Sequence, residues 1–247
     1  MQDIVKYELS SKVAMITLNR PEVLNALNVT LFRQLESLLN ELQKPESGVE
    51  CVVIQGAGKA FSAGHDLRDI AEGDETDHGA FEAAVLEKLA ELPVPVIAKV
   101  HGYCFTGALE LALACDLIFI DADTVLADTH SQWGLSPIWG MTQRLPRRVG
   151  TARAKDLMFS SRRVPADEAL RIGLVDYVVP SGQLDQVVKD YAQGLVKNSS
   201  HSQRISKEIL ATTDGLRLTE GLDYEYLHSP GACEDMEDRI AEFMASR

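Results

Sequence analysis

The sequence predicts an α/β protein with a helical C-terminal region. Over the first half of the chain, short β-rich runs alternate with segments of helical periodicity, and after about residue 142 nearly every segment is helical. There are no internal repeats, low-complexity tracts or long Pro/Gly linkers between these segments. Such alternation is typical of a mostly parallel sheet flanked by helices.

The first half begins with two expected strands, residues 4–9 and 13–18, joined by a turn at Ser10 and Ser11. Apolar residues recur with a helical period between residues 30 and 42. The alternation then continues through strand 51–54, helix 81–92 (stopped by Pro93 and Pro95), strand 96–100, helix 106–115 and strand 117–120.

One further strand is expected at 175–179. The remaining expected helices span 151–159, 166–172, 184–197, 202–213, 219–227 and 234–245. We therefore divide the chain into an α/β core over residues 1–190 and a helical C-terminal region over 191–247, which we expect to serve as an assembly surface.

Composition and charge exclude several classes of protein. The net charge of −13, from 24 basic and 37 acidic residues, argues against non-specific nucleic-acid binding, which needs a basic surface. No apolar run approaches the ~18 residues of a membrane span, and the first residues lack the pattern of a secretion signal. The four cysteines are scattered, without a CxxC pair or a histidine at metal-ligand spacing. We expect a cytoplasmic protein without a metal site, in which Cys104 and Cys115 are small buried residues.

A glycine-containing turn is the first candidate functional segment. Ala63, Gly64 and His65 follow a strand and precede an expected helix, a setting in which a backbone amide can point into a cleft. The upstream run 56–59 has the glycines and lysine of a phosphate loop. However, Lys59 is followed by Ala60 instead of Ser or Thr, and the glycine spacing is wrong. A plain connecting loop is the alternative.

A small-residue pair, Gly107 and Ala108, opens the second candidate segment. The free amides and the positive dipole end of a helix that begins there would favour a developing oxyanion. Glu110 lies three residues further on, over the same helix face. Because its neighbours are apolar, we expect a desolvated carboxyl group with a raised pKa, suited to proton transfer. The alternative is a carboxylate held in a structural hydrogen bond or ion pair. Asp116, at the helix end, is expected to be structural.

A series of motifs, in order along the chain, carries a resemblance to a known family. They are 19–21 (Asn-Arg-Pro), 25–28 (Asn-Ala-Leu-Asn), 61–67 (Phe-Ser-Ala-Gly-His-Asp-Leu), 102–116 (with Gly107, Glu110 and Cys115-Asp116) and the later landmarks 142–146 and 169–175. Together they resemble the enoyl-CoA hydratase/isomerase (crotonase) family between about residues 4 and 179.

The resemblance implies a crotonase-like spiral of ββα units that binds an acyl-coenzyme A thioester. It implies an oxyanion hole made by the N–H groups of His65 and Gly107, with Glu110 on one of two acidic positions of the hydratases. Asn25, Ala26 and Leu27 would line the coenzyme A site together with Ala63, Gly64 and His65. Coenzyme A is then part of the substrate, and no separate cofactor is expected. The resemblance also implies a homotrimer or hexamer, with region 191–247 contributing to assembly and covering the active site.

The position of the second hydratase glutamate is occupied by His130 in this sequence. Hydration needs two groups to hold one water, one taking and one giving a proton. Glu110 alone would suit double-bond isomerisation or protonation of an enolate. His130 could be the second group, since an imidazole titrates near neutral pH, and Asp128 is either its rival or a partner that orients it. The alternative for His130 is a surface or structural histidine. We expect the side chains of His65 and His101 to be structural.

Bulky residues follow where hydratases often have small ones: Trp133, Pro137, Ile138, Trp139 and Met141. They either shape the acyl pocket or belong to the core.

Val23 replaces a basic residue that many relatives carry before the Asn-Ala-Leu segment. We rank enoyl-CoA hydratase first and isomerase close behind, then decarboxylase or hydrolase. The alternative is not an enzyme: it is a protein that binds acyl-CoA without catalysis and acts through partners.

Overall fold

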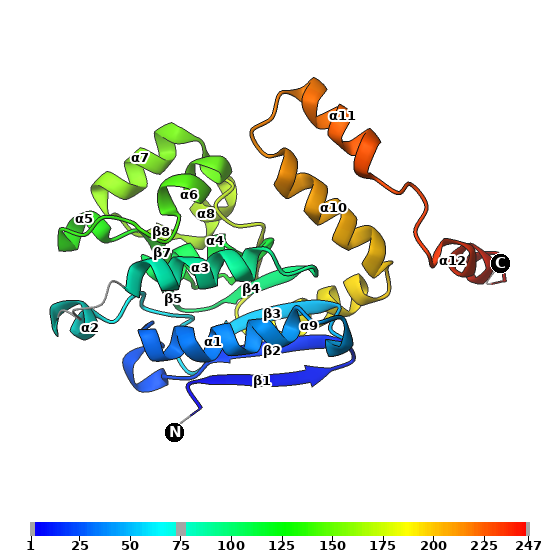
Figure 1. Cartoon of the computed structure of the whole chain (residues 1–247). Coiled ribbons are helices and arrows are strands. Elements are labelled where there is room, and N and C mark those ends of the chain that lie inside the picture. The colour runs from blue at the N-terminus through cyan, green and yellow to red at the C-terminus, as the bar shows by residue number, and fades with distance from the viewer. Residues whose placement is uncertain (1–2, 73–77, 246–247) are drawn as a thin grey trace.

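A six-stranded sheet forms the centre of the computed structural model, which describes residues 3–72 and 78–245 (Figure 1). Its strand order is β1-β2-β3-β4-β6-β9, with β1 antiparallel to β2 and all other neighbours parallel. This confirms the predicted mostly parallel sheet. The strands are β1 (Val5–Ser10), β2 (Val13–Leu18), β3 (Cys51–Gly56), β4 (Val96–Val100), β6 (Leu117–Asp121) and β9 (Tyr177–Val179).

The turn between β1 and β2 lies one residue later than predicted. Ser10 pairs with Val13, so the two turn residues are Ser11 and Lys12, with φ angles of 48° and 65°. Two left-handed residues match the twist of a tight hairpin, and the prediction of a turn at Ser10 and Ser11 was therefore wrong by one position.

Alternate residues of each central strand face two separate layers. Val52 and Ile54 of β3 belong to the larger core cluster, whereas Cys51 and Val53 belong to a smaller cluster on the other face of the sheet. Helices α1 (Val29–Leu42), α3 (His78–Ala90) and α4 (Gly107–Leu113) contribute to the larger cluster, and α9 (Leu184–Val196) covers the other face. The period of two along the strands thus buries both faces of the sheet.

A second, three-stranded sheet was missing from the sequence prediction. It consists of β5 (Tyr103–Phe105), β7 (Val125–Ala127) and β8 (Val164–Pro165), in the order β5-β7-β8. Strands of two or three residues are too short to show a hydrophobic period. Gly102, with φ of 63°, turns the chain from β4 into β5, which leads directly into α4. This succession of two strands and a helix is the ββα unit that the resemblance implied.

The other helices of this half are α2 (Leu67–Glu72), α5 (His130–Trp133), α6 (Met141–Val149), α7 (Thr151–Ser160) and α8 (Ala166–Arg171). Helix α6 was not among the predicted helices, and Pro146 inside it weakens its sequence signal.

Asp116 accepts a hydrogen bond from the N–H of Val96 at 2.7 Å and pairs with Lys207 at 2.7 Å, which confirms its structural role. Cys104 and Cys115 are buried, as predicted.

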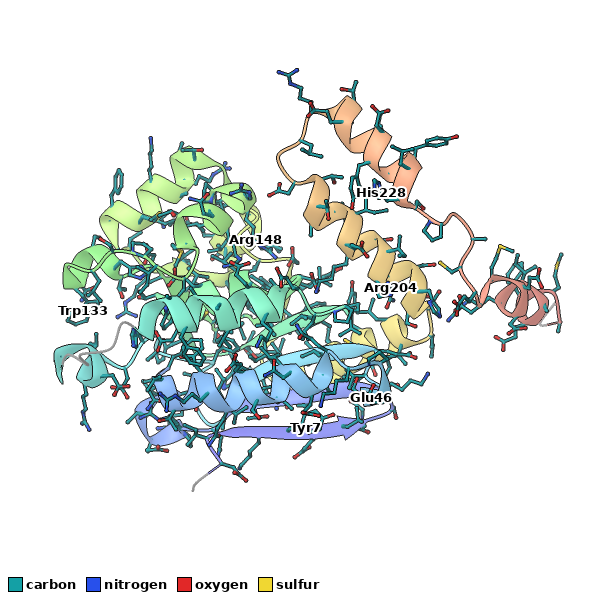
Figure 2. All side chains as sticks on the ribbon, in the orientation of Figure 1. Tyr7, Glu46, Trp133, Arg148, Arg204 and His228 are labelled. Atoms are coloured by element: carbon teal, nitrogen blue, oxygen red, sulfur yellow. The ribbon has the colours of Figure 1, made fainter. Side chains whose placement is uncertain are left out.

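Three helices follow α9: α10 (Ser200–Thr213), α11 (Leu218–His228) and α12 (Met236–Ala245). Helices α10 and α11 lie side by side beyond the core, and α12 lies further out (Figure 1). Figure 2 shows Arg204 on α10 and His228 on α11, both outside the α/β core. None of the described residues in these three helices is buried, and several of their large apolar side chains are exposed. No helix within residues 3–72 and 78–245 is long and apolar enough to span a bilayer.

Candidate active site

The loop around Gly64 meets the start of α4. Gly64 has φ of 96°, and a Cβ atom at this position would lie 2.6 Å from the carbonyl oxygen of Phe105 and 3.4 Å from the nitrogen of Gly107. Only glycine allows both the backbone conformation and this close approach. The loop is fixed to the Leu27 backbone by two hydrogen bonds of 2.8 Å, from Leu27 N–H to Gly64 O and from Asp66 N–H to Leu27 O.

Two backbone amides at this junction have no backbone acceptor. Within the described part of the chain, neither His65 N–H nor Gly107 N–H donates a hydrogen bond to another residue. Gly107 is the first residue of α4, and a Cβ atom there would lie 3.4 Å from the nitrogen of His65, so the two residues are neighbours. Both line a cavity of about 220 Å³. Two free donors at one cavity are what an oxyanion requires.

Thr106 fixes the entry into α4, and sequence reasoning missed it. Its φ of 50° and ψ of −110° are unusual for a residue with a side chain, and such a conformation costs about 1–3 kcal/mol. Its N–H donates to the carbonyl of Ala127 at 2.8 Å, and its hydroxyl bonds with the hydroxyl and N–H groups of Thr129. These contacts with the β7 segment hold the strained residue that precedes Gly107, and no sequence signal marks them.

Glu110 is buried. One of its carboxyl oxygens accepts two backbone hydrogen bonds, and the other faces a histidine. Only 1% of the residue is exposed, and Oε1 accepts hydrogen bonds from the N–H groups of Trp139 (3.1 Å) and Met141 (3.0 Å). Oε2 lies 3.7 Å from Nε2 of His130. Burial raises the pKa of the Glu110 carboxyl, although the Met141 and Trp139 N–H groups and His130 oppose the rise. The predicted direction of this pKa shift is confirmed.

Asp128 holds His130 on the side of the imidazole ring that faces away from Glu110. Nδ1 of His130 lies 2.5 Å from Oδ1 of Asp128, and because a carboxylate accepts, this nitrogen carries the proton and Nε2 faces Glu110. His130 lines the cavity, whereas Asp128 is 1% exposed and does not. This contact favours Asp128 as a partner that orients His130. His130 is 8% exposed and is therefore not a surface residue, and its catalytic or structural role remains a prediction. Burial lowers the pKa of the His65 imidazole. Nε2 of His101 lies 3.0 Å from the carbonyl of Gly58, outside this cavity.

The family model for enoyl-CoA hydratase/isomerase matches residues 8–244. The chain belongs to this family. It is 37% identical over 251 residues to a probable enoyl-CoA hydratase of Mycobacterium tuberculosis, covering 99% of this chain and 96% of that one. It is 34% identical to the short-chain-enoyl-CoA hydratase of Clostridium acetobutylicum, covering 97% and 94%. The crystal structure of an enoyl-CoA hydratase from Bacillus anthracis matches with a TM-score of 0.92 at 31% identity, covering 99% and 97%. These likenesses confirm the crotonase-like fold.

The predicted coenzyme A segment of this enoyl-CoA hydratase/isomerase family member is mostly buried. Asn25, Ala26 and Leu27 are 0%, 7% and 0% exposed. The side-chain amide of Asn25 donates to the backbone carbonyls of Ala57 and Ala60, both at 2.8 Å, and so joins this segment to the loop that follows β3. Of the three residues only Ala26 has any exposed surface, and the predicted role of the segment in binding coenzyme A remains a prediction.

A Gly107→Ala substitution tests how closely the junction is packed. The added Cβ would lie 2.4 Å from the ring of Trp139, so the ring or the helix start must shift. We expect kcat/KM for a 2-enoyl-CoA to fall by about 10²-fold, since displacement of about 1 Å can have that effect. A Gly194→Ala variant is the control because a Cβ there meets nothing within 4 Å. Equal kcat/KM values for both variants would contradict this reading of the junction.

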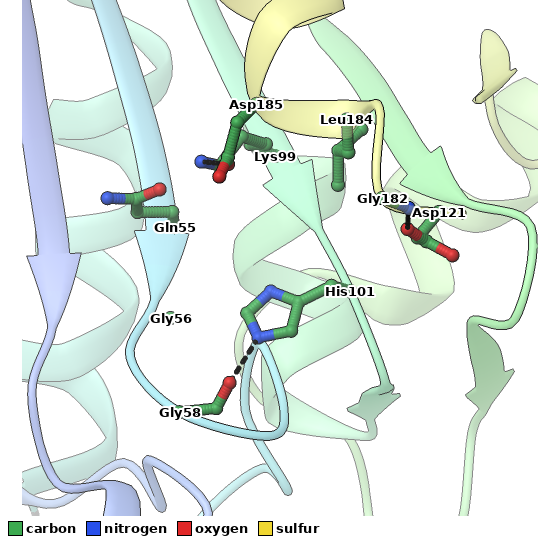
Figure 3. Close-up of a pocket in the computed structure, with 9 residues that line it drawn as sticks. All are labelled: Gln55, Gly56, Gly58, Lys99, His101, Asp121, Gly182, Leu184 and Asp185. Atoms are coloured by element: carbon green, nitrogen blue, oxygen red, sulfur yellow. Dashed lines mark hydrogen bonds and ion pairs between the residues drawn. The ribbon is translucent and has the colours of Figure 1, made fainter. Parts of the chain in front are cut away.

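A second cavity, of about 350 Å³, lies at the carboxyl ends of β3, β4 and β6 (Figure 3). Its polar side chains are paired within the protein. Lys99 bonds with Asp185, His101 with the carbonyl of Gly58, and Asp121 with the N–H of Gly182. Gln55 donates to the hydroxyl of Thr17 at 3.0 Å. With these groups satisfied, we assign the chemistry to the Glu110 cavity.

Proposed function

We propose that the protein is an enoyl-CoA hydratase, which adds water across the double bond of a 2-enoyl-CoA thioester. The observation that carries this proposal is the pair of Glu110 Oε2 and His130 Nε2, 3.7 Å apart in the cavity that the His65 and Gly107 amides also line. A water about 2.8 Å from both atoms can be held by the pair. The names of the hydratase relatives support the same reaction.

In this mechanism the thioester carbonyl accepts hydrogen bonds from His65 N–H and Gly107 N–H. The pair of Glu110 and His130 shares one proton, so one member is a base and the other an acid. The base takes a proton from the water, whose oxygen bonds to C3, and negative charge moves through C2 to the carbonyl oxygen. The acid member then gives its proton to C2. One H and one OH have been added, and transfer between the two residues restores the pair.

The proposal also includes the cofactor, the oligomeric state and the location of the protein. Coenzyme A enters as part of the substrate, and no other cofactor takes part. The exposed apolar side chains of α10 to α12, among them Leu210, Leu218, Tyr226 and Phe243, suit burial in a homotrimer or hexamer. Four free cysteines, three of them buried, agree with a cytoplasmic location.

A three-substrate assay tests the reaction type. Crotonyl-CoA should lose its conjugated thioester absorbance and yield 3-hydroxybutyryl-CoA. If 3-butenoyl-CoA instead gains that absorbance while crotonyl-CoA is unchanged, the protein is an isomerase that uses Glu110 alone. Release of carbon dioxide from a malonyl-type thioester would indicate a decarboxylase. Tight binding of all three without turnover would favour a non-catalytic acyl-CoA-binding protein, and each of these results would overturn the hydratase proposal.

A further inference from the structure

The indole of Trp139 forms one wall of the Glu110 cavity. Trp139 is 3% exposed, and a Cβ atom on Gly107 would lie 2.4 Å from its Cζ3 and 2.9 Å from its Cε3. The ring also lies against the imidazole of His65, with 4.9 Å between centroids. Trp139 therefore contacts both residues whose amides we assign to the thioester carbonyl.

This wall is anchored on several sides. The N–H of Trp139 donates to Glu110 Oε1 at 3.1 Å, and its carbonyl accepts from Arg144 Nη1 at 2.9 Å. Arg144 in turn binds Glu87 of α3 at 2.7 Å, and the ring of Phe32 packs edge-on against the indole at 5.0 Å. The two hydrogen bonds fix the backbone of Trp139 beside Glu110, and the rings of Phe32 and His65 hold the indole in place.

We infer that Trp139 restricts the substrate to short acyl chains, an inference that rests on the proposed binding of an acyl-CoA thioester here. The cavity of about 220 Å³ is smaller than the roughly 300–1,000 Å³ of pockets that enclose drug-sized ligands. Its apolar lining beyond the pair of catalytic groups comes from Leu135, Ile138 and Trp139. An acyl chain whose carbonyl is held at His65 and Gly107 therefore meets the indole within a few carbons.

The indole N–H of Trp139 makes no hydrogen bond to a described residue, so the size of the ring, and not its polarity, should limit the length of the acyl chain. Nε1 of Trp139 is buried and has no hydrogen-bond partner among the described residues. An unpaired buried donor costs about 1–3 kcal/mol, so Trp139→Phe removes that cost while keeping an aromatic wall. Trp139→Leu leaves a smaller side chain and opens the pocket. Trp133, which is 51% exposed and does not line the cavity, provides the matched control Trp133→Ala.

The test compares kcat/KM for crotonyl-CoA and 2-octenoyl-CoA across these variants. One methylene in an apolar pocket changes kcat/KM by about 10–200-fold, so we expect the unaltered protein to prefer crotonyl-CoA by at least about 10²-fold. Trp139→Leu should reduce this ratio by tenfold or more, Trp139→Phe by less, and Trp133→Ala not at all. An unchanged ratio in Trp139→Leu, or a preference of the unaltered protein for octenoyl-CoA, would overturn the inference.

Binding of saturated thioesters separates this inference from the hydratase proposal. Calorimetry with butyryl-CoA and octanoyl-CoA requires no chemistry, and thermal unfolding shows that each variant is folded. If no enoyl-CoA is hydrated but butyryl-CoA binds more tightly, with the preference lost in Trp139→Leu, the proposed reaction is wrong and the role of Trp139 stands. If both thioesters bind equally to the unaltered protein, the role of Trp139 is wrong whatever the reaction.

Discussion

Replacing Glu110 by glutamine is expected to lower kcat/KM for crotonyl-CoA hydration by about 10²–10⁴-fold, the range for loss of a positioned acid or base. Glutamine can still accept the N–H bonds of Trp139 and Met141, so the loss should come from proton transfer and not from misfolding. The unaltered protein should lose kcat/KM on the acid side of its pH profile. Because burial raises the pKa of the Glu110 carboxyl, this loss should begin at a higher pH than the one at which an ordinary glutamate takes up a proton.

Stability provides the control for Glu110→Gln. A carboxyl group whose pKa is raised in the folded state contributes stability below its unfolded pKa of about 4.3, and this contribution is lost as pH rises through the folded pKa. At neutral pH the raised pKa of this group therefore lowers the stability of the folded protein. Glutamine does not titrate, so the variant should melt at a higher temperature than the unaltered protein. The exposed residue Glu91 gives the matched control Glu91→Gln, for which activity should not change. Full activity of Glu110→Gln would contradict the mechanism.

His130→Ala is expected to produce a loss of similar size, about 10²–10⁴-fold in kcat/KM for hydration. Without the imidazole, the Glu110 carboxylate has no partner at 3.7 Å with which to share the proton and the water. The measurement is the loss of crotonyl-CoA absorbance by purified variants. Gln132→Ala, an exposed position in the same short helix, is the control.

The role of Asp128 follows from the same series. Asp128→Asn leaves His130 in place but removes the carboxylate that fixes which nitrogen carries the proton, so hydration should be reduced less than in His130→Ala. Hydration that survives His130→Ala but is lost in Glu110→Gln would show that Glu110 works without the imidazole. The assignment of a Glu–His pair would then be wrong.

The longer strands and most helices could be predicted because each has enough residues to show its period. The core strands expected at 51–54 and 96–100, and the helix that carries Glu110, begin and end within two residues of where they were expected. The three short strands of the second sheet could not be predicted, since two or three residues carry no periodicity. Yet these strands place Thr106 against Thr129 and so position the start of α4.

Within the site, the sequence identified the groups but not their contacts. Glu110 and His130 were singled out by motif position and residue type, and their separation of 3.7 Å depends on the fold. The N–H groups that hold Glu110 come from Trp139 and Met141, 29 and 31 residues away, and nothing in a local pattern predicts such backbone donors. Asp128 was left open between rival and partner because spacing alone does not show which way a side chain points.

A crystal structure of the Glu110→Gln variant with crotonyl-CoA would test the central claim most directly. The thioester carbonyl oxygen should lie about 2.7–3.1 Å from the backbone nitrogens of both His65 and Gly107. The C2–C3 double bond should face residue 110 and Nε2 of His130, with a water between them on the C3 side. A carbonyl oxygen bound elsewhere, or a double bond directed away from His130, would contradict the proposed hydratase site.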